Sequence, residues 1–155
     1  MRAPQKSVAL AAVLFVTLLP LSRRVQAQSA SASITVPLVN GKNGKPFAKE
    51  KIGIVLQNPD SPSGKPERYL PIWTNQKGEA AFDPGNAKTF YASPIGFVWC
   101  DKTVIARLRT NYSVAEILQT GVLTPDDCGH LNSEPLRGKL LLFVRKATLW
   151  ELLKE

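Results

Sequence analysis

One stretch of the chain decides its fold class, and it reads Tyr69-Leu70-Pro71-Ile72-Trp73-Thr74, Asn75-Gln76-Lys77-Gly78, Glu79-Ala80-Ala81-Phe82. Its first and last parts are rich in aromatic and apolar residues, which suit a pleated, half-buried surface. Asn75 and Gly78 are turn formers, and glycine tolerates the positive φ that closes a tight turn. We therefore predict a β-hairpin over residues 69–82.

Short apolar segments alternate with turn signals along the rest of the chain. The predicted strands cover residues 34–39, 51–57, 89–91, 97–100, 104–108 and 138–145. Turns are predicted at 40–46 and 83–86, and the proline-rich segment 58–67 predicts an exposed loop. Pro37 lacks a backbone N–H, so we expect its strand to lie at a sheet edge or to carry a bulge. The pattern predicts an all-β, immunoglobulin-like or prealbumin-like β-sandwich of about seven strands.

Two short helices are predicted beside the strands. Ser113 and Glu116 form a capping box that begins the first helix, and Gly121 suits the C-terminal cap of the same helix. Leu140 to Val144 is continuously apolar, which predicts a central strand covered on both faces. A second capping box, Thr148 with Glu151, begins a terminal helix.

The terminal helix carries an apolar stripe of Leu149, Trp150, Leu152 and Leu153. A helix this short is not stable alone, so it must dock on its own sheet or on a partner. We expect it to pack on its own sheet. If a partner exists, Trp150 is the candidate contact, because tryptophan is enriched in binding hot spots.

Two motifs resemble carboxypeptidase regulatory-like domains, the transthyretin-like or Cna-B-type sandwiches. Gly44-Lys45-Pro46 before the strand at Ile52 is similar to their G-K-P opening, and residues 74–82 resemble their T-D-x-x-G-x-A-x-F motif, with Asn75 in place of Asp. The resemblance covers residues 34–85, and Asn86 to Phe90 departs from the family's P-G-x-Y-x-V strand. It implies an accessory or structural module of small secreted bacterial proteins, without catalytic residues to transfer.

The first residues are typical of a secretory signal peptide rather than of the fold. Arg2 and Lys6 precede an apolar run from Val8 to Leu19, and Val25-Gln26-Ala27 offers small residues at a cleavage site. A run of twelve residues is shorter than the roughly 20 needed to span a bilayer. Arg23 and Arg24 are unusual near a cleavage site, and they leave retention as an anchor open. We expect a signal peptide over 1–27, a flexible leader over 28–33 and a single domain over 34–155, secreted or periplasmic.

The charge of the chain does not indicate nucleic-acid binding. Four of its 20 Lys and Arg residues precede the expected cleavage site, so 16 basic residues would face 12 Asp and Glu, a net charge of +4. These are scattered, with no basic stripe that alternates with aromatic residues. A mildly cationic surface instead favours anionic polymers of the cell envelope as partners.

Cys100 and Cys128 are the two cysteines, and an even count in a secreted chain predicts a disulfide. Closing that loop would stabilise the fold by roughly 3–4 kcal/mol in the chain-entropy model. The alternative is a metal site of Cys100, Cys128 and His130 with Asp126 or Asp127. The Cys128-x-His130 spacing is too short for the usual structural zinc pairs, so we expect no metal and no cofactor.

Two function hypotheses follow. The first is a non-catalytic secreted module with a binding or structural role at the bacterial envelope or outside the cell. The second is a small hydrolase or metal-dependent enzyme centred on His130, the single histidine, with Asp126 and Asp127. The chain lacks a Gly-x-Ser-x-Gly elbow and a His-Glu-x-x-His motif, which favours the first hypothesis and a solvated His130.

Overall fold

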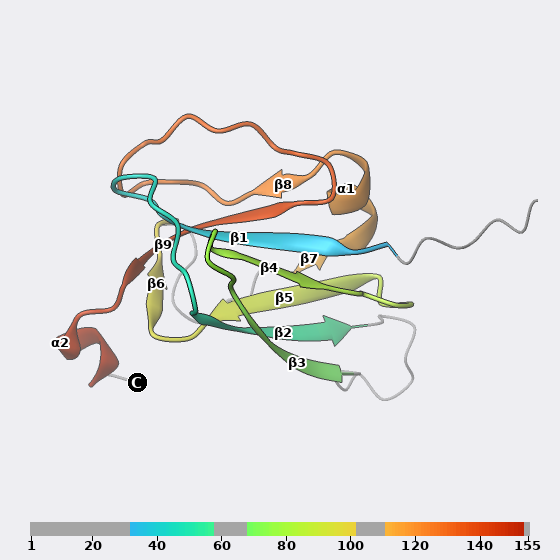
Figure 1. The fold of residues 1–155 in the computed structure, drawn as a ribbon, viewed down its shortest axis with the longest axis horizontal. Coiled ribbons are helices and arrows are strands. Elements are labelled where there is room, and N and C mark those ends of the chain that lie inside the picture. Colours follow the sequence, from blue (N-terminus) through green and yellow to red (C-terminus); the bar gives the residue numbers. More distant parts are fainter. Residues whose placement is uncertain (1–31, 58–67, 102–110, 154–155) are drawn as a thin grey trace, which may run out of the picture.

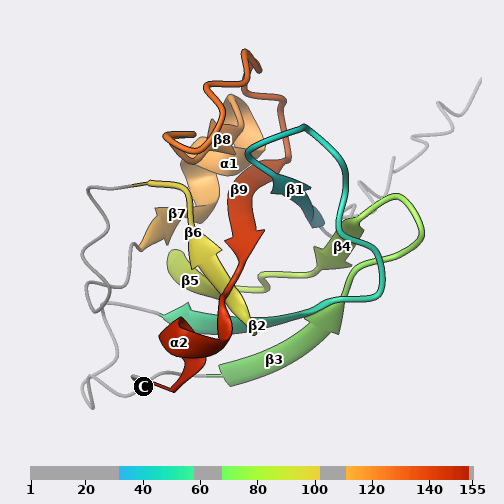
Figure 2. The same cartoon turned by 90° about the vertical axis from the view of Figure 1, so that its left-hand side faces the viewer.

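The chain forms two β-sheets that face each other across one apolar core (Figures 1 and 2). This computed structural model describes residues 32–57, 68–101 and 111–153. The elements are β1 (Ile34–Asn40), β2 (Lys51–Gln57), β3 (Arg68–Trp73), β4 (Glu79–Phe82), β5 (Thr89–Pro94), β6 (Phe97–Trp99), β7 (Tyr112–Ser113), α1 (Val114–Gln119), β8 (Val122–Leu123), β9 (Leu140–Lys146) and α2 (Leu149–Leu152).

One sheet has the strand order β4-β1-β9-β6, with β8 also paired to β9. The other has the order β3-β2-β5-β7, and all its pairs are antiparallel. β9 is the centre of the first sheet: β1 and β8 run parallel to it, and β6 runs antiparallel. Leu142 and Val144 of β9 face the core, so Phe143 between them faces the opposite side of the sheet, where it is only 1% exposed. The predicted all-β architecture and the central, doubly covered strand are confirmed.

The predicted hairpin over residues 69–82 is wrong. β3 pairs with β2, whereas β4 pairs with β1 in the opposite sheet. The turn itself forms, because the Asn75 side chain accepts hydrogen bonds from the N–H groups of Lys77 (2.8 Å) and Glu79 (3.1 Å). Gly78 has a φ of 73°, and its carbonyl accepts from Leu38 N–H of β1 at 2.9 Å. The turn therefore carries the chain across the core from one sheet to the other.

The expectation for Pro37 is also wrong, because β1 is an interior strand between β4 and β9. Thr35 N–H and Gly41 N–H donate to the carbonyls of Gly138 and Val144 on the β9 side. Pro37 occupies the same edge of β1 by alternation and supplies no donor there. The pairing of β1 with β9 is accordingly interrupted between the Thr35–Lys139 bridge and the Leu38–Leu142 pair. The register is the same on both sides of this gap, so no extra residue is inserted as in a bulge.

Several local predictions are confirmed. Ser113 accepts a hydrogen bond from Glu116 N–H at 3.3 Å to begin α1, which confirms the N-cap half of the predicted capping box. Gly121, with a φ of 81°, ends the helix by donating to Ile117 O at 3.0 Å. Turns form at 40–46 and 83–86. The signal peptide at 1–27, leader residues 28–31, the loop at 58–67 and the strand at 104–108 lie outside the described residues. Within the described part of the chain, no helix has the length and apolar character to cross a membrane.

Candidate functional site

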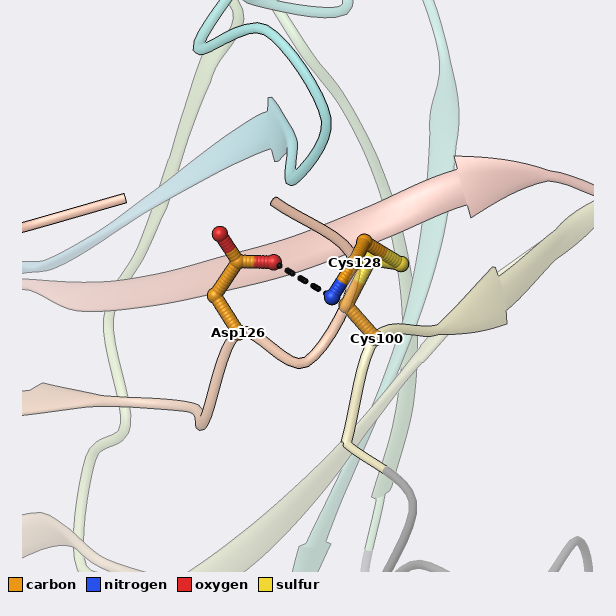
Figure 3. A group of neighbouring side chains, drawn as sticks. All are labelled: Cys100, Asp126 and Cys128. Carbon is orange, nitrogen blue, oxygen red and sulfur yellow. Dashed lines mark hydrogen bonds between the residues drawn. A yellow bond between two sulfur atoms is a disulfide. The ribbon is translucent and has the colours of Figure 1, made fainter. Parts of the chain in front are cut away.

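The predicted disulfide is present between Cys100, just after β6, and Cys128, in the segment between β8 and β9 (Figure 3). The two Cα atoms lie 5.2 Å apart, and the cysteines are 28 positions apart in the sequence. Because both sulfurs are used in this bond, neither is available as a thiolate ligand for a metal. The bridge therefore fastens the long segment before β9 to the end of β6.

Asp126 lies beside the disulfide, and its carboxylate is engaged by the backbone (Figure 3). The carboxylate accepts hydrogen bonds from the N–H groups of Cys128 at 3.1 Å, Gly129 at 3.3 Å and Leu131 at 2.9 Å. Three backbone donors satisfy most of the acceptor sites of one carboxylate. Asp126 thus shapes the loop that carries Cys128, and this is a structural function.

The fit around this loop depends on two glycines. A Cβ atom on Gly41 would lie 2.6 Å from Cys100 Sγ and would also overlap the Asp126 carboxylate. A Cβ atom on Gly129 would overlap the carbonyl of Gly41. The loop of residues 126–131 and the end of β1 are therefore packed backbone against backbone. Sequence reasoning missed both glycines, because their need arises only when distant segments meet.

The structure does not assemble His130 with the two aspartates into a catalytic arrangement. His130 is exposed and has a φ of 56°, and its N–H donates to the Asp126 carbonyl at 3.2 Å. Its imidazole makes no hydrogen bond or ion pair with other residues of the described ranges. The one cluster of metal-ligating types there is Cys100, Asp126 and Cys128, without His130 or Asp127.

Trp150 lies on α2, which projects from the end of β9 (Figure 2). The expected packing on the chain's own sheet is wrong for three side chains: Leu149, Trp150 and Leu153 are 71%, 76% and 70% exposed. The helix is held instead by a bidentate ion pair, with Arg145 Nη1 and Nη2 at 2.8 and 2.5 Å from the Glu151 carboxylate. Hydrogen bonds from Arg145 and from Thr148 hold the pKa of Glu151 well below its usual range.

A second exposed surface lies on the outer face of the four-stranded sheet. Tyr69 and Trp73 of β3 are 55% and 63% exposed there. Sequence reasoning assigned these rings to a half-buried hairpin. The signal that could have found the surface is the alternation within β3, where Leu70 and Ile72 pack on the core and the odd-numbered residues face away.

Comparisons with known proteins add no relative: no family model, no curated protein and no solved structure matches this chain.

Proposed function

We propose that this protein is a non-catalytic secreted module that binds a polymer or protein of the bacterial envelope. The observation that carries the proposal is the exposure of two aromatic surfaces, Tyr69 with Trp73 on β3 and Leu149, Trp150 and Leu153 at α2. Large exposed apolar groups that cluster on a folded domain mark interaction sites. Tyrosine and tryptophan are also enriched among the few residues that dominate binding energy at interfaces.

The chemistry of the described residues supports binding rather than catalysis. The Asp126 carboxylate is satisfied by backbone donors, and His130 has no acidic or hydroxyl partner in the described ranges. A general base needs its partner within hydrogen-bond reach. The hydrolase alternative therefore finds no support in this geometry, and we do not propose it.

Secretion and fold family belong to the same proposal. The disulfide fits an oxidising compartment outside the cytoplasm, as the predicted signal peptide over 1–27 implies. Two facing sheets and the G-K-P and T-N-x-x-G motifs support an immunoglobulin-like sandwich of the carboxypeptidase regulatory-like type. In that group such domains are accessory or structural parts.

Cosedimentation of the purified protein with envelope fragments of the producing bacterium tests the proposal. We expect the protein to pellet with the fragments, and Trp73→Ala or Trp150→Ala to reduce the pelleted fraction. Leu136→Ala is the matched control, because Leu136 is 58% exposed but lies on neither surface. High salt separates a contribution from cationic side chains, which it screens, from apolar contact, which it does not. If the protein stays in the supernatant at low and high salt, the proposal is wrong.

A further inference from the structure

We propose that the outer face of the β3–β2–β5 layer binds an anionic glycan chain, with sugar rings stacked on Tyr69 and Trp73. This inference rests on the proposed function, because it names the envelope polymer that the module would bind. The exposed part of this face lies at β3, where Tyr69 and Trp73 are 55% and 63% exposed. The outward positions include Lys51, Tyr69, Pro71, Trp73 and Tyr91, and the outward Gly53 and Val55 at the middle of β2 are buried.

Strand alternation places these residues on one surface. Ile52, Ile54 and Leu56 of β2 all belong to the core, so the odd-numbered residues of β2 face outward. The register pairs Lys51 with Trp73 and Gly53 with Pro71, so the outward residues of β3 lie beside those of β2. Phe90 and Ala92 of β5 are also core residues, which places Tyr91 on the outer side.

Gly53 leaves room for the Tyr69 ring on this face. A Cβ atom there would lie 3.0 Å from Tyr69 Cε2, 3.4 Å from Cζ and 3.1 Å from the hydroxyl oxygen. One side of the Tyr69 ring and its hydroxyl therefore lie over Gly53, and the residue is 55% exposed. Tyr69 and Trp73 are four residues apart on one strand, which is about 13 Å at roughly 3.3 Å per residue. That separation suits several linked sugars rather than one.

The chemistry of the face selects the ligand. The C–H faces of a pyranose ring are apolar with a slight positive charge, and the negative faces of aromatic rings attract them. Lys51 Nζ lies 5.9 Å from the centroid of the Trp73 ring, so a cation stands next to the stacking surface. Among the described residues of β2, β3 and β5, the outer face carries no carboxylate. A sugar chain that bears carboxylates matches both the rings and the charge.

Titration of the full protein with a galacturonic acid hexasaccharide tests this inference, and a glucose hexasaccharide is the neutral comparison. We expect the acidic chain to bind more tightly, and Trp73→Ala and Tyr69→Ala each to weaken its binding at least tenfold. Lys51→Gln should remove the preference for the acidic chain and leave neutral binding unchanged. Gly53→Ala should weaken binding by displacing the Tyr69 ring while leaving both rings in the chain.

Leu136→Ala is the control, because it removes a side chain that is 58% exposed and lies on neither aromatic surface. Its affinity should equal that of the wild type, and thermal unfolding verifies that each variant is folded. The inference is overturned if the acidic hexasaccharide does not bind, if the neutral one binds equally well, or if Trp73→Ala and Tyr69→Ala bind like the wild type. Envelope cosedimentation without hexasaccharide binding would reject the glycan surface and keep the binding module; loss of both would reject the module too.

Discussion

The backbone of Gly129 lies directly against the carbonyl oxygen of Gly41, and no side chain fits between them. Gly41 follows the end of β1, and Gly129 follows the disulfide residue Cys128. The disulfide, the Asp126 loop and this glycine pair thus form one structural unit that holds the segment between β8 and β9 in place.

Gly129→Ala tests that close approach. The added methyl group would overlap the Gly41 carbonyl, so the loop must shift and we expect a loss of about 1–3 kcal/mol in the free energy of unfolding. Urea denaturation measures it. Lys42→Ala, an exposed change next to Gly41, is the control and should stay within about 0.5 kcal/mol of the wild type. Equal stability of Gly129→Ala and the control would contradict the packing described here.

Removing the disulfide with the double variant Cys100→Ser, Cys128→Ser should cost roughly 3–4 kcal/mol, because the unfolded chain gains the freedom of a 28-residue separation. Denaturation of the variant, and of the wild type with and without reductant, provides the measurement. Reductant should lower the wild-type midpoint and leave that of the variant unchanged. A thiol-labelling assay on the unreduced, denatured wild type should detect no free thiol, and labelling of both cysteines would refute the bridge.

The buried phenol of Tyr112 leads us to predict a loss of stability at alkaline pH. Burial, with a smaller contribution from the charge of Asp101, raises the pKa of Tyr112 to about 12 from 10.0. The unfolded state therefore releases the phenolic proton first, and stability falls from about pH 10 until the folded phenol also ionises near pH 12. The loss is roughly 2 to 3 kcal/mol at 1.36 kcal/mol per pKa unit.

Tyr112→Phe is the matched variant for this effect, because it keeps the ring that packs 5.9 Å from the Phe90 ring. The unfolding free energy of this variant should fall less between pH 10 and 12 than that of the wild type, because the contribution from Tyr112 is absent. An alkaline decline identical in the two proteins would show that Tyr112 is not its source.

The Arg145–Glu151 pair predicts that α2 is released in acid. Hydrogen bonds from Arg145 and Thr148 lower the pKa of Glu151 from its ordinary value of 4.5. The stabilising contribution of this carboxylate is therefore present above that value and is lost as pH falls through the folded pKa. Glu151→Gln should speed amide exchange across Leu149–Leu152 at neutral pH with little change in the denaturation midpoint. Glu50→Gln is the control, because it breaks the separate Lys146–Glu50 pair at 3.0 Å. Amide exchange across Leu149–Leu152 should be much slower in this variant than in Glu151→Gln.

Local chemistry determined much of this protein. Alternating apolar residues specified the strands, and Ser113 and Gly121 specified the ends of α1. An even cysteine count, together with the predicted signal peptide, indicated the disulfide. Each of these depends on interactions between residues close in sequence, or on chemistry with a single available partner. For the same reason, the strand-turn-strand pattern over 69–82 was found correctly as two strands and a turn.

Only the tertiary structure decided which strands pair and which faces stay exposed. A turn such as 75–78 closes a hairpin or crosses between sheets with the same local hydrogen bonds, and the choice depends on the distant partners Leu38 and Ile52. Pro37 lies inside a sheet because β4 and β9 both pair with β1, which its own residues do not encode. The exposed rings of Tyr69, Trp73 and Trp150 likewise follow from what the rest of the chain leaves uncovered. Long-range contacts set these features, and a sequence read residue by residue contains only the local part of that information.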